Sequence, residues 1–151
     1  MSHISKYLWP EDILLDVDVA NKTQLFNDIG RHMEREHGMS HEWLIAGLSR
    51  REQLGSTGLG EGVAIPHARI EGLSQIHIAY LRLKTPIPFD APDGKPVSDI
   101  IVILVPKQAT EEHLQILAET TQIFADSKFR ENLHSCQHAI EVKSMIESFA
   151  W

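Results

Sequence analysis

The sequence predicts a three-layer α/β/α domain, in which a central mixed β-sheet is flanked by helices. Residues 99–105, D-I-I-V-I-L-V, are nearly all apolar, which is typical of a central strand buried on both faces. Around this segment, strand-like stretches alternate with stretches of helical periodicity. With 151 residues the chain has the usual size of one domain, and we expect residues 1–151 to form a single α/β domain.

The first part of the chain is predicted to form a strand between helices. Residues 1–9 fit a short helix that ends before a proline. Alternating apolar residues over 13–19 predict a strand with one buried face. Asn21 is a favourable N-cap for a helix over about 22–37, and a glycine ends it. A serine then caps the next helix, which continues to about residue 53.

The middle of the chain is predicted from apolar runs and breaker residues. Val63–Ile65 fits a short buried strand, and residues 76–83 fit a longer one. Residues 85–97 contain four prolines and an Asp-Gly turn, which predicts a loop. A loop of that length is a candidate rim of a functional site.

Three helices are predicted after the central strand, over 111–125, 127–134 and 139–149. Thr110 is the expected N-cap of the first helix. Helical spacing predicts that its inward face is formed by Leu114, Leu117, Ala118, Thr121 and Phe124.

Composition narrows the classes of function. The formal charge of −7 and the lack of a basic block argue against binding to nucleic acid or to an acidic membrane surface. The single cysteine, Cys136, excludes an internal disulfide and fits a reducing compartment. No apolar run approaches 18 residues, and the N-terminus lacks a basic-then-apolar signal. We therefore expect a cytoplasmic protein without membrane insertion.

The most unusual stretch is 51–69, R-E-Q-L-G-S-T-G-L-G-E-G-V-A-I-P-H-A-R, which holds four of the nine glycines. That density indicates positive φ angles or a close approach of the backbone to another group. Pro66 follows the short strand and fixes the backbone just before His67. The pattern predicts a rigid, glycine-lined pocket with an imidazole at its mouth.

The order of residues in this stretch excludes three common sequence motifs. Gly55 and Gly60 have the spacing of a P-loop, but Glu-Gly follows them instead of Lys-Ser/Thr. Gly58 and Gly60 begin a dinucleotide fingerprint, but its third glycine would fall on Val63. A nucleophile elbow around Ser56 lacks its first glycine. What remains is a histidine, two hydroxyls, backbone amides and nearby arginines.

These groups suit phosphoryl transfer through His67 itself. A neutral imidazole nitrogen is a competent nucleophile near pH 7, because the ordinary pKa of histidine is about 6.5. The transferred group carries charge on its equatorial oxygens, so its site needs donors and positive charge more than a base. Arg51 is the candidate cation. The candidate phosphoryl-binding donors are Ser56, Thr57, Gly58 and Gly60.

His113 is the second candidate histidine. It lies in the predicted first turn of a helix that follows the central strand, and strand ends are where α/β sheets build sites. The positive end of that helix disfavours an imidazolium and favours an anion. Simpler interpretations remain for each residue: His67 as a turn histidine, His113 as a surface residue, and Arg51 as a cation that complements a helix dipole.

The run over 51–67 resembles the phosphorylation site of the enzyme IIA proteins of the bacterial phosphotransferase system. The fructose/mannitol/nitrogen-regulatory class is the most similar, and within it the nitrogen-regulatory type. Segments at 85–90 (T-P-I-P-F-D), 104–106 (L-V-P) and 111–114 (E-E-H-L) also match the class. The resemblance therefore covers about residues 5–148.

This resemblance implies a phosphocarrier with His67 as the phosphorylated nucleophile and with Arg51 and His113 in its site. The implied donor is the phosphohistidine of an HPr-like protein, so that neither a metal nor another cofactor is needed. The implied acceptor is a regulatory target protein in the nitrogen-regulatory type, or a IIB domain in the sugar-specific type. A binding module that carries no phosphate is a third alternative. The sequence leaves open which imidazole nitrogen is modified.

Two other groups contain potential metal ligands. One consists of His134, Cys136 and His138, and the other of His37 and His41. Neither has a known zinc spacing, and we expect these side chains to be exposed and unliganded.

Overall fold

The structure is a computed structural model that describes residues 3–108 and 110–149. Its strands are β1 (Leu8–Val17), β2 (Gly58–Gly60), β3 (Val63–Ala64), β4 (His67–Ile70), β5 (His77–Ile87) and β6 (Val97–Pro106). They form one mixed sheet with the order β1-β5-β6-β3-β2, and β4 pairs with β6 beside this path. The apolar segment predicted as the central strand is β6, which pairs with three other strands.

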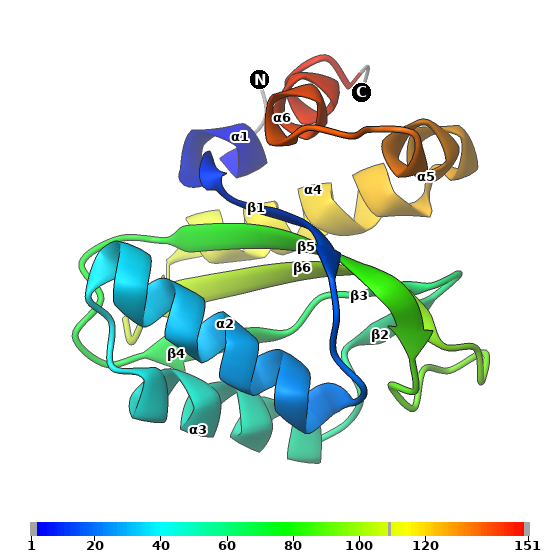
Figure 1. Cartoon of the computed structure of the whole chain (residues 1–151). Helices are drawn as coiled ribbons and strands as arrows, with labels where there is room; N and C mark the ends of the chain where they lie inside the picture. Colours follow the sequence, from blue (N-terminus) through cyan, green and yellow to red (C-terminus); the bar gives the residue numbers. More distant parts are fainter. Residues whose placement is uncertain (1–2, 109, 150–151) are drawn as a thin grey trace.

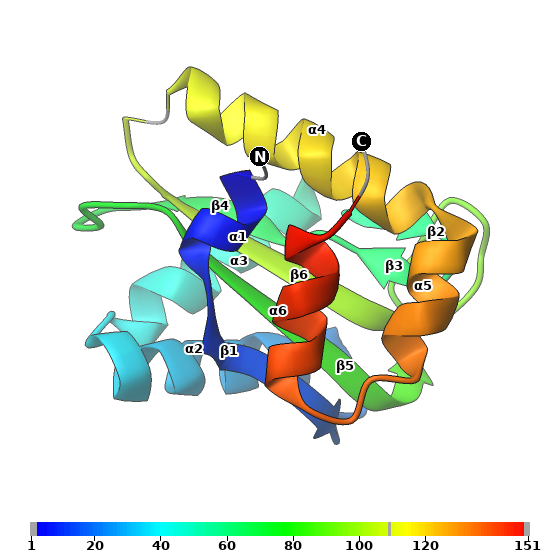
Figure 2. The same ribbon diagram turned by 90° about the horizontal axis from the view of Figure 1, so that it is seen from above.

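Helices cover both faces of this sheet, as Figures 1 and 2 show. They are α1 (His3–Tyr7), α2 (Lys22–His37), α3 (His41–Gln53), α4 (Glu111–Ala125), α5 (Ser127–His134) and α6 (Ala139–Glu147). The helices α2 and α3 lie on one face, and the other four lie on the opposite face. The three-layer α/β/α prediction is confirmed. Within residues 3–108 and 110–149, no helix is both long enough and apolar enough to cross a membrane.

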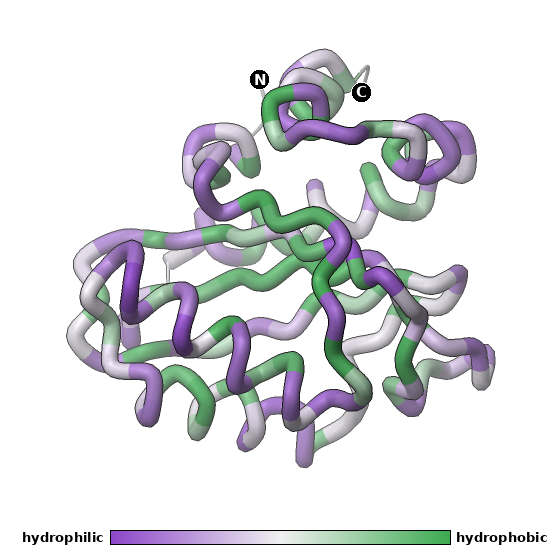
Figure 3. Tube along the Cα trace, in the orientation of Figure 1, coloured by the Kyte–Doolittle hydropathy of each residue, from purple (hydrophilic) through white to green (hydrophobic). Residues whose placement is uncertain are grey.

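The core consists of two apolar layers that meet at β6. Ile100, Val102 and Leu104 pack toward α2 and α3. The residues between them, Ile101 and Ile103, pack toward α4, α5 and α6. Figure 3 shows hydrophobic residues concentrated along the central strands, between the two helical layers. Burial of both faces explains why this strand has no polar alternation.

The strands β3 and β4 lie in line along the same side of β6. The first pairs in parallel with Asp99 and Ile100, and the second continues from Ile103 to Pro106. Between them, the carbonyl of Pro66 accepts a hydrogen bond from the Ile103 amide at 3.0 Å. The sequence did not predict β4, which has only four residues. Its pairing fixes His67 at the start of a strand rather than in a free loop.

The predicted bounds of α2 and α3 are confirmed, because the capping residues act as expected. The Asn21 side chain accepts a hydrogen bond from the Gln24 amide at 2.9 Å. The Ser40 side chain accepts from the Trp43 amide at 3.3 Å. Gly38 ends α2 with a left-handed φ of 69°, which a glycine adopts without a steric cost.

Two predictions about buried faces were wrong. In β1, Ile13 and Leu14 pack into opposite core layers, so the strand is covered on both faces. In α4, Phe124 is buried as predicted and Leu117 packs against the core, but Leu114 is 66% exposed, and Ala118 and Thr121 also face outward. The other buried residues of the helix are His113, Ile116, Thr120 and Ile123. Each of them precedes a predicted position by one residue, so the buried face is rotated from the predicted one, and packing against the sheet selects the face with the two isoleucines.

Candidate active site

The side chain of His67 is half-buried at the first position of β4. Its Nδ1 lies 2.9 Å from the carbonyl oxygen of Ile65, which is an acceptor only. In the neutral ring, Nδ1 therefore carries the proton and Nε2 carries the lone pair. The short backbone segment around Pro66 thus fixes both the orientation and the tautomer of the imidazole.

Arg51 faces the other nitrogen of the ring. Its Nε donates a hydrogen bond to Nε2 of His67 at 3.3 Å. Its Nη1 donates to the carbonyl of Gly55 at 2.8 Å. Arg51 lies in the last turn of α3, where the helix dipole favours a cation. The guanidinium therefore connects the glycine-rich segment to the imidazole nitrogen that carries the lone pair.

His113 lies beside His67, with 6.2 Å between the ring centroids. It is 9% exposed, and its Nε2 has no hydrogen-bond partner among the described residues. Burial lowers the pKa of His113, and the neighbouring charges of His67 and Arg69 lower it further. A neutral imidazole with an uncommitted nitrogen is therefore held next to His67.

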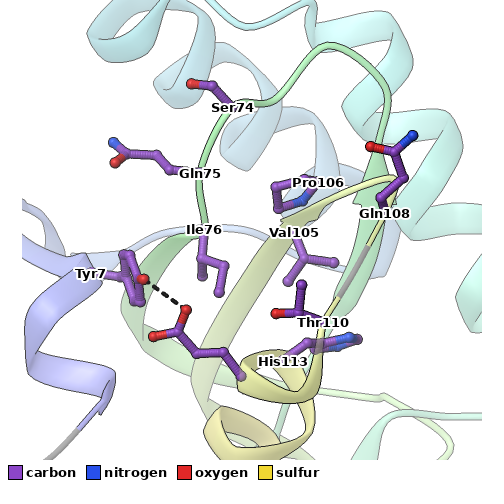
Figure 4. Close-up of a pocket in the computed structure, with 10 residues that line it drawn as sticks. Tyr7, Ser74, Gln75, Ile76, Val105, Pro106, Gln108, Thr110 and His113 are labelled. Atoms are coloured by element: carbon purple, nitrogen blue, oxygen red, sulfur yellow. Dashed lines mark hydrogen bonds between the residues drawn. The ribbon is translucent and has the colours of Figure 1, made fainter.

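The start of α4 carries His113 to this place directly after β6. Figure 4 shows His113 and Thr110 at the start of the helix, next to Val105 near the end of the strand. They border a small open cavity of about 180 Å³. On its far side, Tyr7 donates a hydrogen bond to Glu112 at 2.9 Å. The expected position of Thr110 as N-cap is confirmed, but its side chain makes no capping hydrogen bond.

The glycines of the loop have the special backbone positions that their number predicts. Gly60 and Gly62 have positive φ angles of 93° and 79°. At Gly58, a Cβ would lie 2.8 Å from the Cβ of Ala91, so only glycine fits without a shift. The loop is therefore packed closely against the segment that follows β5.

Three of the predicted donors of the loop, Ser56, Thr57 and Gly58, are engaged within the chain. The Ser56 hydroxyl donates to the carbonyl of Phe89 at 2.6 Å and accepts from the Gly58 amide at 3.0 Å. The amide and hydroxyl of Thr57 donate to the carboxylate of Glu52. Direct donation to phosphoryl oxygens from Ser56, Thr57, Gly58 and Gly60 stays a prediction. Glu52 was not predicted from the sequence as part of this site, although it stands next to Arg51.

The expected exposure of the two potential metal groups is partly wrong. Cys136 is 6% exposed, and the His37 side chain is 9% exposed. His37 contacts the buried carboxylate of Asp12, and His134 contacts that of Asp99. Across residues 3–108 and 110–149, no group of three or more His, Cys, Asp or Glu side chains is arranged to hold a metal ion.

We predict a pH dependence for any reaction in which His67 is the nucleophile. Burial lowers the pKa of His67, and the Arg51 charge acts in the same direction, while the Ile65 carbonyl and Glu52 oppose them. The ring therefore takes up a proton at a lower pH than an ordinary histidine, whose pKa is about 6.5. The rate should fall with decreasing pH, and the midpoint of this fall should lie below about pH 6.5. Rates of phosphoryl acceptance between about pH 5 and 8 test this, and a midpoint above about pH 6.5 would contradict it.

The class of protein is shown by a match of residues 6–149 to the model of a family of phosphotransferase-system enzyme IIA proteins. The chain belongs to the family described as "Phosphoenolpyruvate-dependent sugar phosphotransferase system, EIIA 2".

Individual relatives agree with this assignment. A "Nitrogen regulatory protein" of Pseudomonas aeruginosa is 36% identical over 140 residues, which cover 92% of this chain and 91% of the relative. A "PTS system fructose-specific EIIA component" of Haloferax volcanii is 33% identical, and the match covers 79% and 73% of the two chains. The crystal structure of the IIA-Ntr protein of Neisseria meningitidis superposes with a TM-score of 0.91 at 45% identity, covering 96% and 99%. The mannitol IIA of Escherichia coli, at 20% identity and a TM-score of 0.74, shares the fold.

Proposed function

We propose that this protein is a phosphocarrier that accepts a phosphoryl group on Nε2 of His67 from the phosphohistidine of an HPr-like protein. The observation that carries the proposal is the arrangement of the imidazole. Its Nδ1 is held by the Ile65 carbonyl, while its Nε2 faces the guanidinium of Arg51. The similarity to nitrogen regulatory proteins supports an output in which phosphorylation controls binding to target proteins.

The chemical step is a direct exchange between two imidazoles. The Nε2 lone pair of His67 attacks phosphorus, and the N–P bond of the donor breaks with its electron pair returning to the donor ring. Nδ1 keeps its proton, and the Ile65 carbonyl stabilises the positive charge that develops on the accepting ring. Arg51 exchanges its contact with Nε2 for the equatorial oxygens of the phosphoryl group. The donor is already activated, so the step needs no nucleotide.

Reconstituted phosphorylation tests this proposal. The chain is incubated with phosphoenolpyruvate, enzyme I and an HPr-like phosphocarrier, and the modified residue is located by mass spectrometry under conditions that preserve phosphohistidine. We expect one phosphoryl group on His67. A wild-type chain that takes no label would contradict the proposal and favour a binding module without phosphate.

A sugar-specific role is the second candidate, because the Haloferax volcanii relative is named as a fructose-specific component. In that role the phosphoryl group passes to a IIB domain. Transfer from the labelled chain to fructose-type and mannitol-type IIB domains separates the two candidates. Transfer as fast as the loading of His67 would favour the sugar-specific role, and slow transfer to both would favour regulation.

Replacing His113 should affect the two directions of transfer unequally. In His113→Ala we expect acceptance to fall by less than about tenfold and onward transfer by about 10²-fold, because the imidazole beside His67 no longer offers a polar contact to the phosphoryl group as the N–P bond lengthens. His113→Gln, which keeps a side-chain donor, should recover part of the loss. Rapid-quench rates in both directions measure the effect. Unchanged rates in both directions would show that His113 has no role.

A further inference from the structure

Lys22 occupies a position that a helix does not favour for a cation. It is the first residue of α2, where the helix dipole is positive. Its side chain is nevertheless only 23% exposed. The Nζ atom lies 2.9 Å from a carboxylate oxygen of Glu52 and donates to the carbonyl of Phe89 at 3.2 Å. It also lies over the Phe89 ring, 4.3 Å from the centroid.

Glu52, the partner of Lys22, is likewise a charge at an unfavourable end of its helix. It lies in the last turn of α3, where the dipole disfavours an anion, and its side chain is 6% exposed. Besides the contact with Lys22, its carboxylate accepts two groups of Thr57, the amide at 3.2 Å and the hydroxyl. Each charge interacts unfavourably with the dipole of its own helix. Each is compensated by the ion pair and by hydrogen bonds from other segments. Such a break of a local rule points to a functional site.

The same contacts tie the glycine loop to the segment after β5. The carbonyl of Phe89 accepts from Lys22 and also from Ser56, and Ser56 accepts from the Gly58 amide. The start of α2, the end of α3, the loop and residues 89–90 therefore meet around Lys22, whose Nζ also lies 3.8 Å from the exposed carboxylate of Asp90. Neither charged residue contacts His67, but Glu52 is adjacent in the chain to Arg51, which does.

We propose that Lys22 and Glu52 are positioning residues, whose ion pair clamps the glycine loop and Arg51 in the arrangement that phosphoryl transfer at His67 requires. This inference rests on the proposed function. A displacement of about 1 Å at a reacting centre costs about 10² in rate, so a small movement of the loop after loss of this pair has a large effect. The pair also keeps the Glu52 carboxylate from competing for the Arg51 guanidinium and from repelling an incoming phosphoryl group.

Three variants test the clamp: Lys22→Met, Glu52→Gln and the double variant. Each single variant should accept the phosphoryl group about 10- to 100-fold more slowly than wild type. The double variant should be no slower than the slower single variant, because both changes break the same pair. Arg31→Met is the matched control, since Arg31 lies on the same helix in an exposed ion pair with Asp28, and it should leave the rate unchanged. Rates within twofold of wild type in both single variants, or losses that multiply, would overturn the proposal.

Titration of His67 by NMR separates a positioning role from a general loss of stability. Glu52→Gln removes a charge that raises the pKa of His67, so that pKa should fall. Lys22→Met leaves the carboxylate unneutralised, so the pKa of His67 should rise. Shifts in the same direction would overturn the proposal, because loosening of the fold does not predict opposite signs.

The NMR spectra also test whether the Lys22–Glu52 pair holds the loop, independently of phosphorylation. A wild-type chain that takes no label contradicts the phosphocarrier role alone. The amide resonances of residues 55–62 should still move in Lys22→Met, because the loop depends on the pair. Changes confined to the first turn of α2 would show that no clamp exists.

Discussion

Replacing His67 by alanine should reduce phosphoryl acceptance to the background of the assay. The imidazole supplies the nucleophile, and removal of a nucleophile eliminates the covalent path rather than slowing it. The other groups of the site, Arg51 and His113, supply charge and hydrogen bonds but form no bond to phosphorus in the proposed step. No other single substitution in this site should reduce the rate of phosphoryl acceptance as much.

His67→Asn separates loss of the nucleophile from a change in loop geometry. The asparagine amide nitrogen can occupy the place of Nδ1 and donate to the Ile65 carbonyl, so the loop should keep its geometry without a nucleophile. His41→Ala is the matched control, because His41 is exposed and pairs with Glu34 away from the site. Mass spectrometry of the reconstituted reaction should show no label in the two His67 variants and full label in the control. Label retained in His67→Asn at the wild-type rate would assign the nucleophile to another residue.

The features that the sequence predicted well are those fixed by local chemistry. Asn21 and Ser40 cap their helices through side-chain contacts with residues three positions away. The all-apolar segment of β6 requires apolar partners on both faces, whichever elements supply them. His67 was chosen as the candidate nucleophile because glycines and a proline restrict the backbone near it in the chain, and that role stays a prediction.

The features that it missed depend on contacts between distant segments. The four residues of β4 become a strand only because β6 offers the edge with which they pair. The buried face of α4 is rotated from the one that its apolar spacing predicted, and packing against the sheet decides this orientation. The pair of Lys22 and Glu52 joins residues 30 positions apart, and no periodicity indicates such a contact. Tertiary packing decides each of these features.

Replacing Arg51 by methionine should slow phosphoryl acceptance by about 10²- to 10³-fold, the usual cost of removing one preorganised donor from a site of developing charge. The guanidinium has two tasks here. Its Nε faces Nε2 of His67, and its Nη1 holds the Gly55 carbonyl. Arg51→Lys keeps the charge but loses the planar fork, so a lysine cannot make both contacts with the same geometry. Arg51→Lys should therefore recover less than a tenth of the lost rate.

The control is Arg35→Met, because Arg35 occupies the same last-turn position on α2 and complements the dipole of that helix. If Arg51 acted only by complementing the dipole of α3, the two methionine variants would lose similar amounts of stability. Neither would then show a large fall in the rate of phosphorylation. Thermal unfolding and single-turnover phosphorylation measured on the same samples distinguish these cases. A fall in rate confined to Arg51→Met, with similar melting temperatures, would assign the guanidinium to the phosphoryl group. Full recovery in Arg51→Lys would instead show that positive charge alone is sufficient, and the two-contact geometry would then have no catalytic role.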